Sequence, residues 1–183
     1  MKKLLVFLIL LLVVFCTKEE TQIEPKDVVE LVPLDNEISG WTRSSAMEIA
    51  ENETQLYDII DGAGQVYIDN NFVKFVRQFY EGDISGAVTI ELHIADMNDT
   101  VNAKNVYDDQ ATGNEIPWTN DNAGVEARYK LVTGIAVNYY ELDFWDDKFY
   151  SWIYIGDDSD AALDVAKLFA LNISEAIRDT TAQ

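Results

Sequence analysis

The sequence predicts a single α+β domain, in which an antiparallel sheet of about five or six strands carries about three helices. Two observations support this fold class. Apolar residues recur at helical spacing in three segments, whereas five other segments are short apolar or alternating runs. The predicted strands follow one another in adjacent pairs joined by short turns. Such pairs need no helical crossover, which disfavours a parallel sheet.

Three segments have the pattern of helices. The first starts after Asn52, a residue suited to cap a helix, and is expected to close at Asn70-Asn71. Gly62 and Gly64 each cost about 1 kcal/mol relative to alanine inside a helix, so we expect a close backbone approach or a kink there. The other two helices are expected over residues 99–110 and 160–178.

Five segments have the pattern of strands. The clearest alternates cleanly, with Thr89, Glu91 and His93 on the face opposite to an apolar stripe, which is typical of a half-buried antiparallel strand. Asp146-Asp147 is expected to form the tight turn between the last two strands. The strands are expected over residues 73–80, 87–95, 126–131, 135–144 and 149–155.

Length and charge exclude several classes of function. The chain has 183 residues, which is enough for one domain. Its 13 basic and 33 acidic residues give a formal net charge of −20. This charge argues against nucleic acid as a partner, because neutralising phosphates needs a basic face, and against docking on anionic lipid headgroups. With one histidine and one cysteine, a zinc site is disfavoured, so we expect no metal or cofactor.

The N-terminus has the pattern of an export signal. Lys2 and Lys3 precede twelve apolar residues, Leu4 to Phe15, and the polar sequence begins directly after Cys16. Twelve residues are too few for a membrane-spanning helix, which needs about 20, and fit the apolar region of a signal peptide. An uncleaved membrane tether is one alternative interpretation; a plain buried cysteine is another, which the position of Cys16 at the end of the apolar run disfavours.

These sixteen residues resemble a bacterial lipoprotein signal. The resemblance implies that residues 1–15 are removed and that Cys16 becomes the lipid-modified first residue of an exported, envelope-anchored protein, on the periplasmic or cell-surface side. Removal of the two lysines then lowers the net charge from −20 to −22. Attachment to the membrane would depend on the lipid, because an acidic domain is repelled by anionic headgroups.

Residues 16–35 are expected to form a flexible spacer, and residues 36–183 the domain. The spacer segment is rich in charge, contains Pro25 and Pro33, and shows no sustained period. A short edge strand through Val28-Val29 and Leu31-Val32 is the alternative.

A second resemblance concerns the domain. Gly40-Trp41, followed by Leu56-Tyr57-Asp58-Ile59-Ile60-Asp61-Gly62-Ala63-Gly64-Gln65-Val66-Tyr67, resembles an uncharacterised family of bacterial exported proteins with a Gly-Trp and a later Leu-Tyr-x-x-Ile-Asp-Gly helix. The resemblance implies a shared fold and no particular activity. The element order is also loosely similar to that of Mog1-like and PsbP-like domains, an analogy of fold alone.

Aromatic residues give the best candidate for a binding site. One predicted hairpin carries them on both faces, with Tyr150, Trp152 and Tyr154 on one side of its last strand and Phe149, Ile153 and Ile155 on the other. One face must pack on the domain's own helices, and the second is either covered too or forms a cleft or partner surface. The candidate ligand- or partner-binding residues are Trp145, Trp152, Tyr150, Tyr154 and Arg77.

The expected function is therefore that of a membrane-anchored envelope lipoprotein whose non-catalytic domain binds a protein partner or a small ligand. A hydrolase using Asp58 and Asp61, three apart on one helix face, is one alternative. A cation-binding or structural envelope component is the other. Asp96, Asn98 and Asp99 are also compatible with the start of a cation site, but capping of the second helix explains them better.

Overall fold

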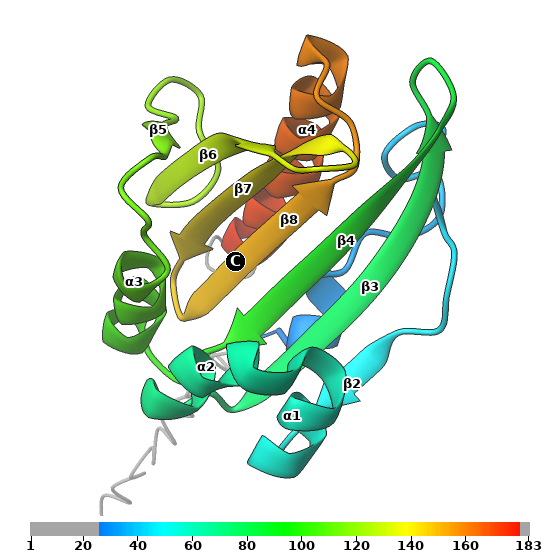
Figure 1. Cartoon of the computed structure of the whole chain (residues 1–183). Coiled ribbons are helices and arrows are strands. Elements are labelled where there is room, and N and C mark those ends of the chain that lie inside the picture. Colours follow the sequence, from blue (N-terminus) through cyan, green and yellow to red (C-terminus); the bar gives the residue numbers. More distant parts are fainter. Residues whose placement is uncertain (1–25, 180–183) are drawn as a thin grey trace, which may run out of the picture.

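The computed structural model describes residues 26–179, and the core of this part is one eight-stranded antiparallel sheet (Figure 1). Strands run in the order β1-β3-β4-β8-β7-β6-β5, and β2 pairs with β3. The five predicted strands are present, and three short strands at the margins, β1, β2 and β5, enlarge the sheet. The strands are β1 (Thr42–Arg43), β2 (Glu48–Ala50), β3 (Lys74–Asp83), β4 (Ala87–Asp96), β5 (Ile116–Pro117), β6 (Glu126–Thr133), β7 (Asn138–Asp146) and β8 (Phe149–Ile155).

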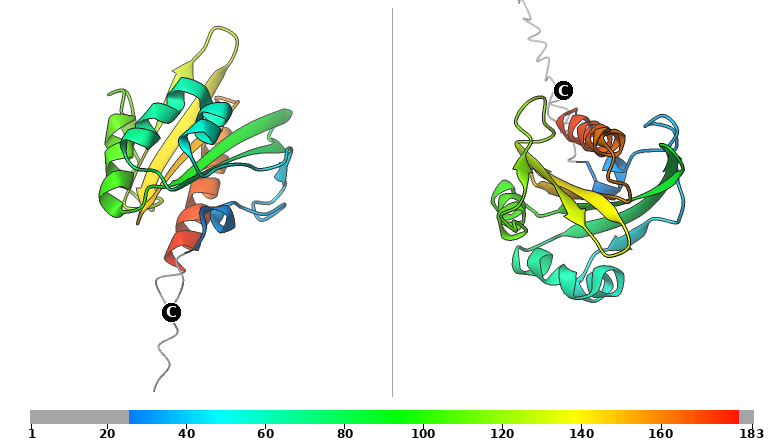
Figure 2. Two further views of the ribbon diagram at one scale, coloured as in Figure 1. Left: turned by 90° about the horizontal axis from the view of Figure 1, so that it is seen from below. Right: turned by 45° about the horizontal axis from the view of Figure 1, so that its top comes forward.

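Helices cover both faces of the sheet, which confirms the predicted α+β class (Figure 2). On one face lie the long helix α4 and the 3₁₀ helix η1. On the other lie α3 and the short connected helices α1, η2 and α2. The helical elements are η1 (Val28–Leu31), α1 (Glu53–Ile60), η2 (Asp61–Gly64), α2 (Gln65–Asp69), α3 (Thr100–Asp109) and α4 (Asp160–Arg178). Over residues 26–179, no helix is long and apolar enough to cross a membrane.

The sheet therefore separates two apolar cores. Phe149, Ile153 and Ile155 of β8 point to the core under α4, together with Phe169 of that helix. Tyr150 points to the opposite core, among residues of α1, α2 and α3. The alternation of β8 predicted this separation, because successive side chains of a strand point to opposite faces.

The first predicted helix is broken in the structure. Asn52 caps α1, its side chain accepting a hydrogen bond from the Gln55 amide at 3.1 Å. The helix ends at Ile60, because Asp61 has a φ of 49°, and a 3₁₀ turn through Gly62 and Gly64 leads into α2. The kink expected at the glycines is thus a change of helix type. A Cβ on Gly64 would lie 3.2 Å from Leu56 Cγ, so this glycine also permits a close approach.

The expectation of a flexible spacer over residues 16–35 is corrected for residues 26–35, which pack on the domain. Val28, Leu31 and Val32 are at most 3% exposed and belong to the core under α4. Val28 and Leu31, one 3₁₀ turn apart, lie on one face of η1, and Val32 follows as its C-cap; η1 packs on β3, β4 and α4. The Tyr80 hydroxyl also donates to the Pro33 carbonyl at 2.7 Å. Residues 1–25, with the predicted signal and Cys16, lie outside the described residues.

Candidate functional site

The sheet face opposite to α4 carries a row of polar and aromatic side chains across five strands. In the strand register, Arg77 of β3 pairs with His93 of β4, His93 with Trp152 of β8, Trp152 with Asp143 of β7, and Asp143 with Arg128 of β6. Side chains at directly paired positions lie on the same face. This row therefore assembles residues that are up to 75 positions apart in the sequence, as with Arg77 and Trp152.

A second row lies two residues further along each strand on the same face. It consists of Phe79, Glu91, Tyr154, Glu141 and Lys130, again in register from β3 to β6. Helices α1, α2 and α3 cover one end of this face and leave the other end open (Figure 1). The two rows lie at the border between the covered and the open part.

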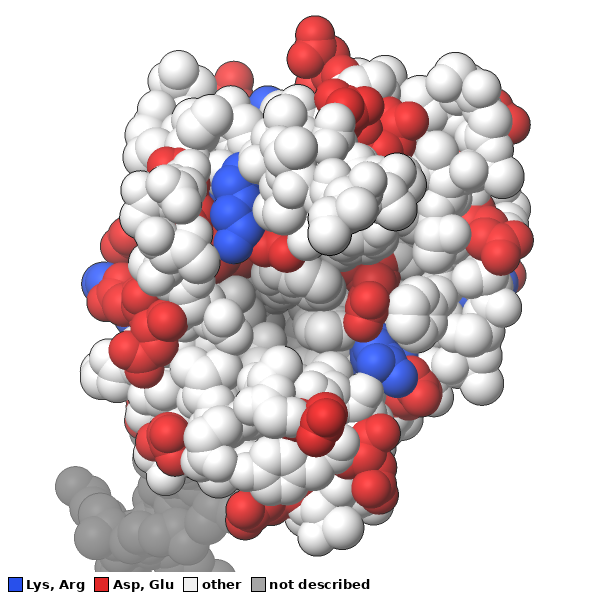
Figure 3. All heavy atoms as spheres, viewed as in Figure 1, with Lys and Arg blue, Asp and Glu red and all other residues white. Residues whose placement is uncertain are grey.

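A cleft of about 230 Å³ occupies this border. Figure 3 shows the face hollowed at its centre, with acidic and basic side chains around the hollow. The floor comes from the sheet and the wall from the broken helix and α3. The lining residues are Ile60, Ala63, Tyr67, His93, Gln110, Glu141 and Trp152. The break between α1 and α2 shapes the wall, since Ile60, Ala63 and Tyr67 all come from the α1–η2–α2 segment.

Aromatic rings continue from the cleft floor onto the open part of the face. The His93 ring lies 4.8 Å from that of Trp152 between centroids. Trp152 stacks on Tyr154 at 6.4 Å with an interplanar angle of 27°, and Tyr154 lies 4.8 Å from Tyr139. We call these four rings the aromatic strip. Trp152, Tyr154 and Tyr139 are half-buried, so a flat or apolar ligand has ring faces and edges to contact.

His93 and Glu91 form a hydrogen-bonded pair beside the cleft. Their Nε2 and Oε1 atoms are 2.8 Å apart. Burial of the His93 ring lowers its pKa, although the adjacent Glu91 carboxylate acts in the opposite direction. Burial also opposes ionisation of Glu91, but the His93 hydrogen bond and the Arg77 charge hold the pKa of Glu91 below its ordinary value. At neutral pH the pair is therefore a neutral imidazole donating to a carboxylate.

Two clusters of charge border the cleft. On the β3 side, Arg77 Nε lies 2.6 Å from Glu48 and Nη1 lies 3.8 Å from Glu91. On the β6 side, Lys130 Nζ lies 2.8 Å from Glu141 and 3.8 Å from Glu115. Each cluster holds two carboxylates and one cation, so each carries one excess negative charge.

A buried ion pair lies beside the cleft on the same face of the sheet, under α3. Arg128 contacts Asp143 through Nε at 2.9 Å and Nη2 at 2.7 Å, and Nη2 also donates to the Tyr107 carbonyl. The Tyr150 hydroxyl donates to Asp143 at 3.2 Å. Tyr150 in turn packs on Tyr67, a lining residue, with 5.9 Å between ring centroids. The pair thereby fixes the position of Tyr67.

The structure divides the predicted site residues into two groups. Trp152 lines the cleft and Tyr154 continues the aromatic strip, as a binding role requires. Trp145 and Tyr150 are 6% and 1% exposed and belong to the core under the short helices, where a ligand cannot reach them. Arg77 is held by Glu48 and by the Ile59 carbonyl, to which Nη1 donates at 2.7 Å. The contact to Glu48 is a structural ion pair.

Four polar cleft residues, Tyr67, His93, Gln110 and Glu141, were absent from the predicted set, although the alternation of β4 places His93 on this face. The sequence indicates which face Glu141 lies on, because Tyr139, Glu141 and Asp143 alternate with apolar residues of β7. It does not indicate which residues of other strands lie beside it. Tyr67 and Gln110 reach the cleft from helices whose positions on the sheet the local sequence does not specify. Within residues 26–179, no hydrogen bond engages the Tyr67 hydroxyl or the Gln110 side-chain amide, so both can serve a ligand.

The acidic pairs behind the alternative functions lie elsewhere. Asp58 and Asp61 are both exposed, and neither lines the cleft, which removes the basis for a hydrolase acting through them. Asp99 caps α3 by accepting from the Asn102 amide at 2.9 Å, which confirms the capping interpretation. Among residues 26–179, no group of three or more His, Cys, Asp or Glu side chains has the arrangement of a metal site.

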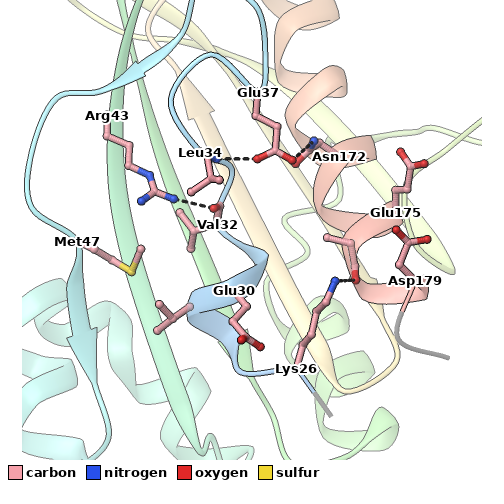
Figure 4. Close-up of a pocket in the computed structure, with 12 residues that line it drawn as sticks. Lys26, Glu30, Val32, Leu34, Glu37, Arg43, Met47, Asn172, Glu175 and Asp179 are labelled. Atoms are coloured by element: carbon pink, nitrogen blue, oxygen red, sulfur yellow. Dashed lines mark hydrogen bonds between the residues drawn. The ribbon is translucent and has the colours of Figure 1, made fainter. Parts of the chain in front are cut away.

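A larger pocket of about 490 Å³ lies on the opposite side of the sheet, between η1 and the end of α4 (Figure 4). Its polar side chains form hydrogen bonds between the segment around η1 and the C-terminal part of α4. Lys26 Nζ donates to the Ala176 carbonyl at 2.8 Å, and Glu37 accepts from the Leu34 amide at 2.7 Å and from Asn172 at 3.1 Å. Lys26 and Asp179, the first and last described residues, both line it. The pocket therefore lies where the segment that leads into β1 meets the C-terminal half of α4.

The lowered pKa of His93 predicts a pH dependence of stability. In the unfolded chain His93 takes up a proton as the pH falls through about 6.5, whereas in the folded chain it stays neutral to lower pH. The unfolded state then binds more protons, so stability is lost as the pH falls below this value. In urea titrations, the free energy of unfolding should fall more steeply from about pH 7 to about pH 5.5 in the wild type than in His93→Gln. If the free energy of unfolding changed equally with pH in both proteins, this would contradict a neutral His93 ring in the folded state.

Comparisons with known proteins show the fold alone. No protein-family model matches the chain, and no curated protein matches it in sequence. Among solved structures, the fold is similar to the extracellular domain of PknH from Mycobacterium tuberculosis, with a TM-score of 0.52. The likeness covers 85% of this chain and 98% of that domain at 9% sequence identity. A shared fold at this level of identity does not imply a shared function.

Proposed function

We propose that this protein is an exported, lipid-anchored envelope protein whose domain binds a small ligand in the cleft beside the aromatic strip. The observation that carries the proposal is the cleft. It combines exposed ring surface with four polar lining groups from Tyr67, His93, Gln110 and Glu141. An apolar concavity with a few convergent polar groups is the usual form of a small-molecule site. A volume of about 230 Å³ suits a small molecule better than a segment of a protein partner.

A non-catalytic role agrees with the chemistry of the lining. His93 and Glu91 form an acid–base pair, but among residues 26–179 no serine, threonine or cysteine that such a pair would activate lines the cleft. Binding without turnover is therefore the simpler interpretation of these residues.

The proposed anchor is compatible with an open cleft. Cys16 precedes Lys26 by ten residues, which span at most about 35 Å when fully extended. Lys26 lies beside the end of α4, on the face of the sheet opposite to the aromatic strip. The chain thus enters the domain on the face opposite to the cleft, so an anchor at Cys16 does not require the membrane to cover the cleft.

Lipidation is tested by metabolic labelling with a palmitate analogue in a bacterial host. Wild-type protein should incorporate the label and Cys16→Ala should not, because this is the only cysteine of the chain. Thr17→Ala serves as the control and should label like the wild type. Undiminished labelling of Cys16→Ala would contradict lipidation at Cys16, even if the protein were found in a membrane fraction.

Ligand binding is tested by the melting temperature of the full chain in detergent against four classes of small molecule. The classes are organic cations, neutral sugars, amino acids and organic phosphates. A ligand that binds only the folded state raises the melting temperature in proportion to RT ln(1 + [L]/Kd). We expect one class to raise it in the wild type and in Leu168→Ala, an exposed position on α4, but not in Trp152→Leu. No shift in any class, or equal shifts in all three proteins, would overturn a ligand site in the cleft.

A further inference from the structure

We infer that the ligand of the cleft is a small organic cation with an apolar surface, of the quaternary or alkylammonium type. This inference rests on the proposed function and adds the chemical class of the ligand. It is carried by three features of the described residues: the charge clusters at the two borders, the aromatic strip between them, and the state of the two border cations.

The charge clusters favour a positive ligand over a neutral or negative one. Glu48 and Glu91 share Arg77, and Glu141 and Glu115 share Lys130. Each cluster carries a net charge of about −1, because two carboxylates share one cation. The neutral His93 ring does not compensate this charge. Of these carboxylates, Glu141 itself lines the cleft. A cation placed beside it supplies the missing charge in a partly dehydrated site, where Coulomb interactions are stronger than in water.

The aromatic strip provides the second contact that such a ligand needs. The faces of aromatic rings attract cations, and tryptophan does so most strongly. Trp152 lines the cleft and is flanked by His93 on one side and Tyr154 on the other. An alkylammonium group has an apolar shell that can pack on these rings while its charge interacts with them and with Glu141. A bare metal ion would leave the rings unused.

The border cations argue against an anion. Arg77 uses Nε for Glu48 and Nη1 for the Ile59 carbonyl, and Lys130 contacts two carboxylates. Both are only about 20% exposed in their side chains. A phosphate or a carboxylate at either cation would therefore compete with carboxylates that are already in place. The net charge of −20 further raises the local concentration of cations and lowers that of anions.

The test compares two ligands that differ only in charge. Choline and its uncharged isostere, in which a quaternary carbon replaces the ammonium nitrogen, are titrated into the full chain in detergent at fixed salt, with isothermal calorimetry as the readout. We expect choline to bind at least about tenfold more tightly than the isostere, a difference of about 1.4 kcal/mol. In Glu141→Gln the affinity for choline should fall by about tenfold, whereas the weak binding of the isostere should remain.

Glu175→Gln is the matched control, since Glu175 lies on α4 on the opposite side of the sheet. It should bind choline like the wild type. Equal affinities of choline and the isostere would overturn the cation inference, as would an unchanged choline affinity in Glu141→Gln. A second outcome is that choline does not bind, but a sugar, amino acid or phosphate raises the melting temperature of the wild type and not of Trp152→Leu. The inferred ligand class is then wrong and the proposed function stands. If no class binds, both fail.

Discussion

Replacing Arg128 by methionine is expected to lower the free energy of unfolding by about 3–5 kcal/mol, because it leaves Asp143 buried without its cation. Arg128 is 7% exposed and contacts Asp143 through two nitrogens, 2.9 and 2.7 Å from the carboxylate. It also lies over the Tyr107 ring at 4.0 Å. Burial already raises the pKa of Asp143 against the opposing effect of Arg128. Without Arg128 the carboxyl would be protonated at higher pH still, so the loss of stability should be smaller in acid.

Urea unfolding of four proteins measures this effect: the wild type, Arg128→Met, Asp143→Leu and the double variant. Removing both charges leaves no uncompensated ion, so the double variant should be more stable than Arg128→Met. Arg128→Met should also weaken ligand binding, since Asp143 holds Tyr150 and Tyr150 packs on the lining residue Tyr67. A loss below about 1 kcal/mol in Arg128→Met at neutral pH would show that the pair is not buried as described.

Replacing Phe169 by alanine should destabilise the protein by a similar amount, about 3–5 kcal/mol, through a different mechanism. Phe169 of α4 is fully buried and makes edge contacts with Trp41 at 5.8 Å and with Tyr80 at 4.9 Å between ring centroids. Its removal opens a cavity in the core under α4, which the surrounding sheet can fill only in part.

The two variants together test whether the sheet separates the domain into independent halves. Phe169 and the cleft lie on opposite faces, so Phe169→Ala should keep the ligand affinity of the wild type at temperatures where it stays folded. Its destabilisation should add to that of Arg128→Met within about 0.5 kcal/mol, since the two sites share no contact. A loss of ligand affinity in Phe169→Ala as large as in Arg128→Met would contradict this separation.

Much of the fold could be predicted from local patterns. The alternation through Thr89, Glu91 and His93 predicted β4 and the face that it turns to the cleft, and Asn52 and Asp99 predicted two helix starts. The segment from residue 26 to 35 was assigned to the spacer because it is charged, contains Pro33 and shows no sustained period. Val28, Leu31 and Val32 are buried only through contacts with β3, β4 and α4, which a local pattern cannot reveal.

The candidate site could be predicted only in part, for a related reason. Period-two alternation placed Tyr150, Trp152 and Tyr154 on one face correctly, but it could not say which of them a helix covers. That depends on where α2 and α3 sit, and they bury Tyr150 and leave Trp152 half-exposed. Glu141 lies beside the aromatic strip because the β7–β8 register pairs it with Tyr154. The register brings together residues whose separate positions in the sequence carry no such signal.

The most direct test of the proposed ligand site is the NMR spectrum of the imidazole ring. His93 is the only histidine of the chain, so its ring signals are single and assigned without mutagenesis, and they report from the cleft lining itself. During a choline titration at neutral pH, we predict that these signals shift in the wild type with the affinity found by calorimetry. In Trp152→Leu they should stay in place. Imidazole signals that do not move while choline, or any other ligand of the panel, is bound would place that ligand elsewhere and contradict the cleft as the binding site.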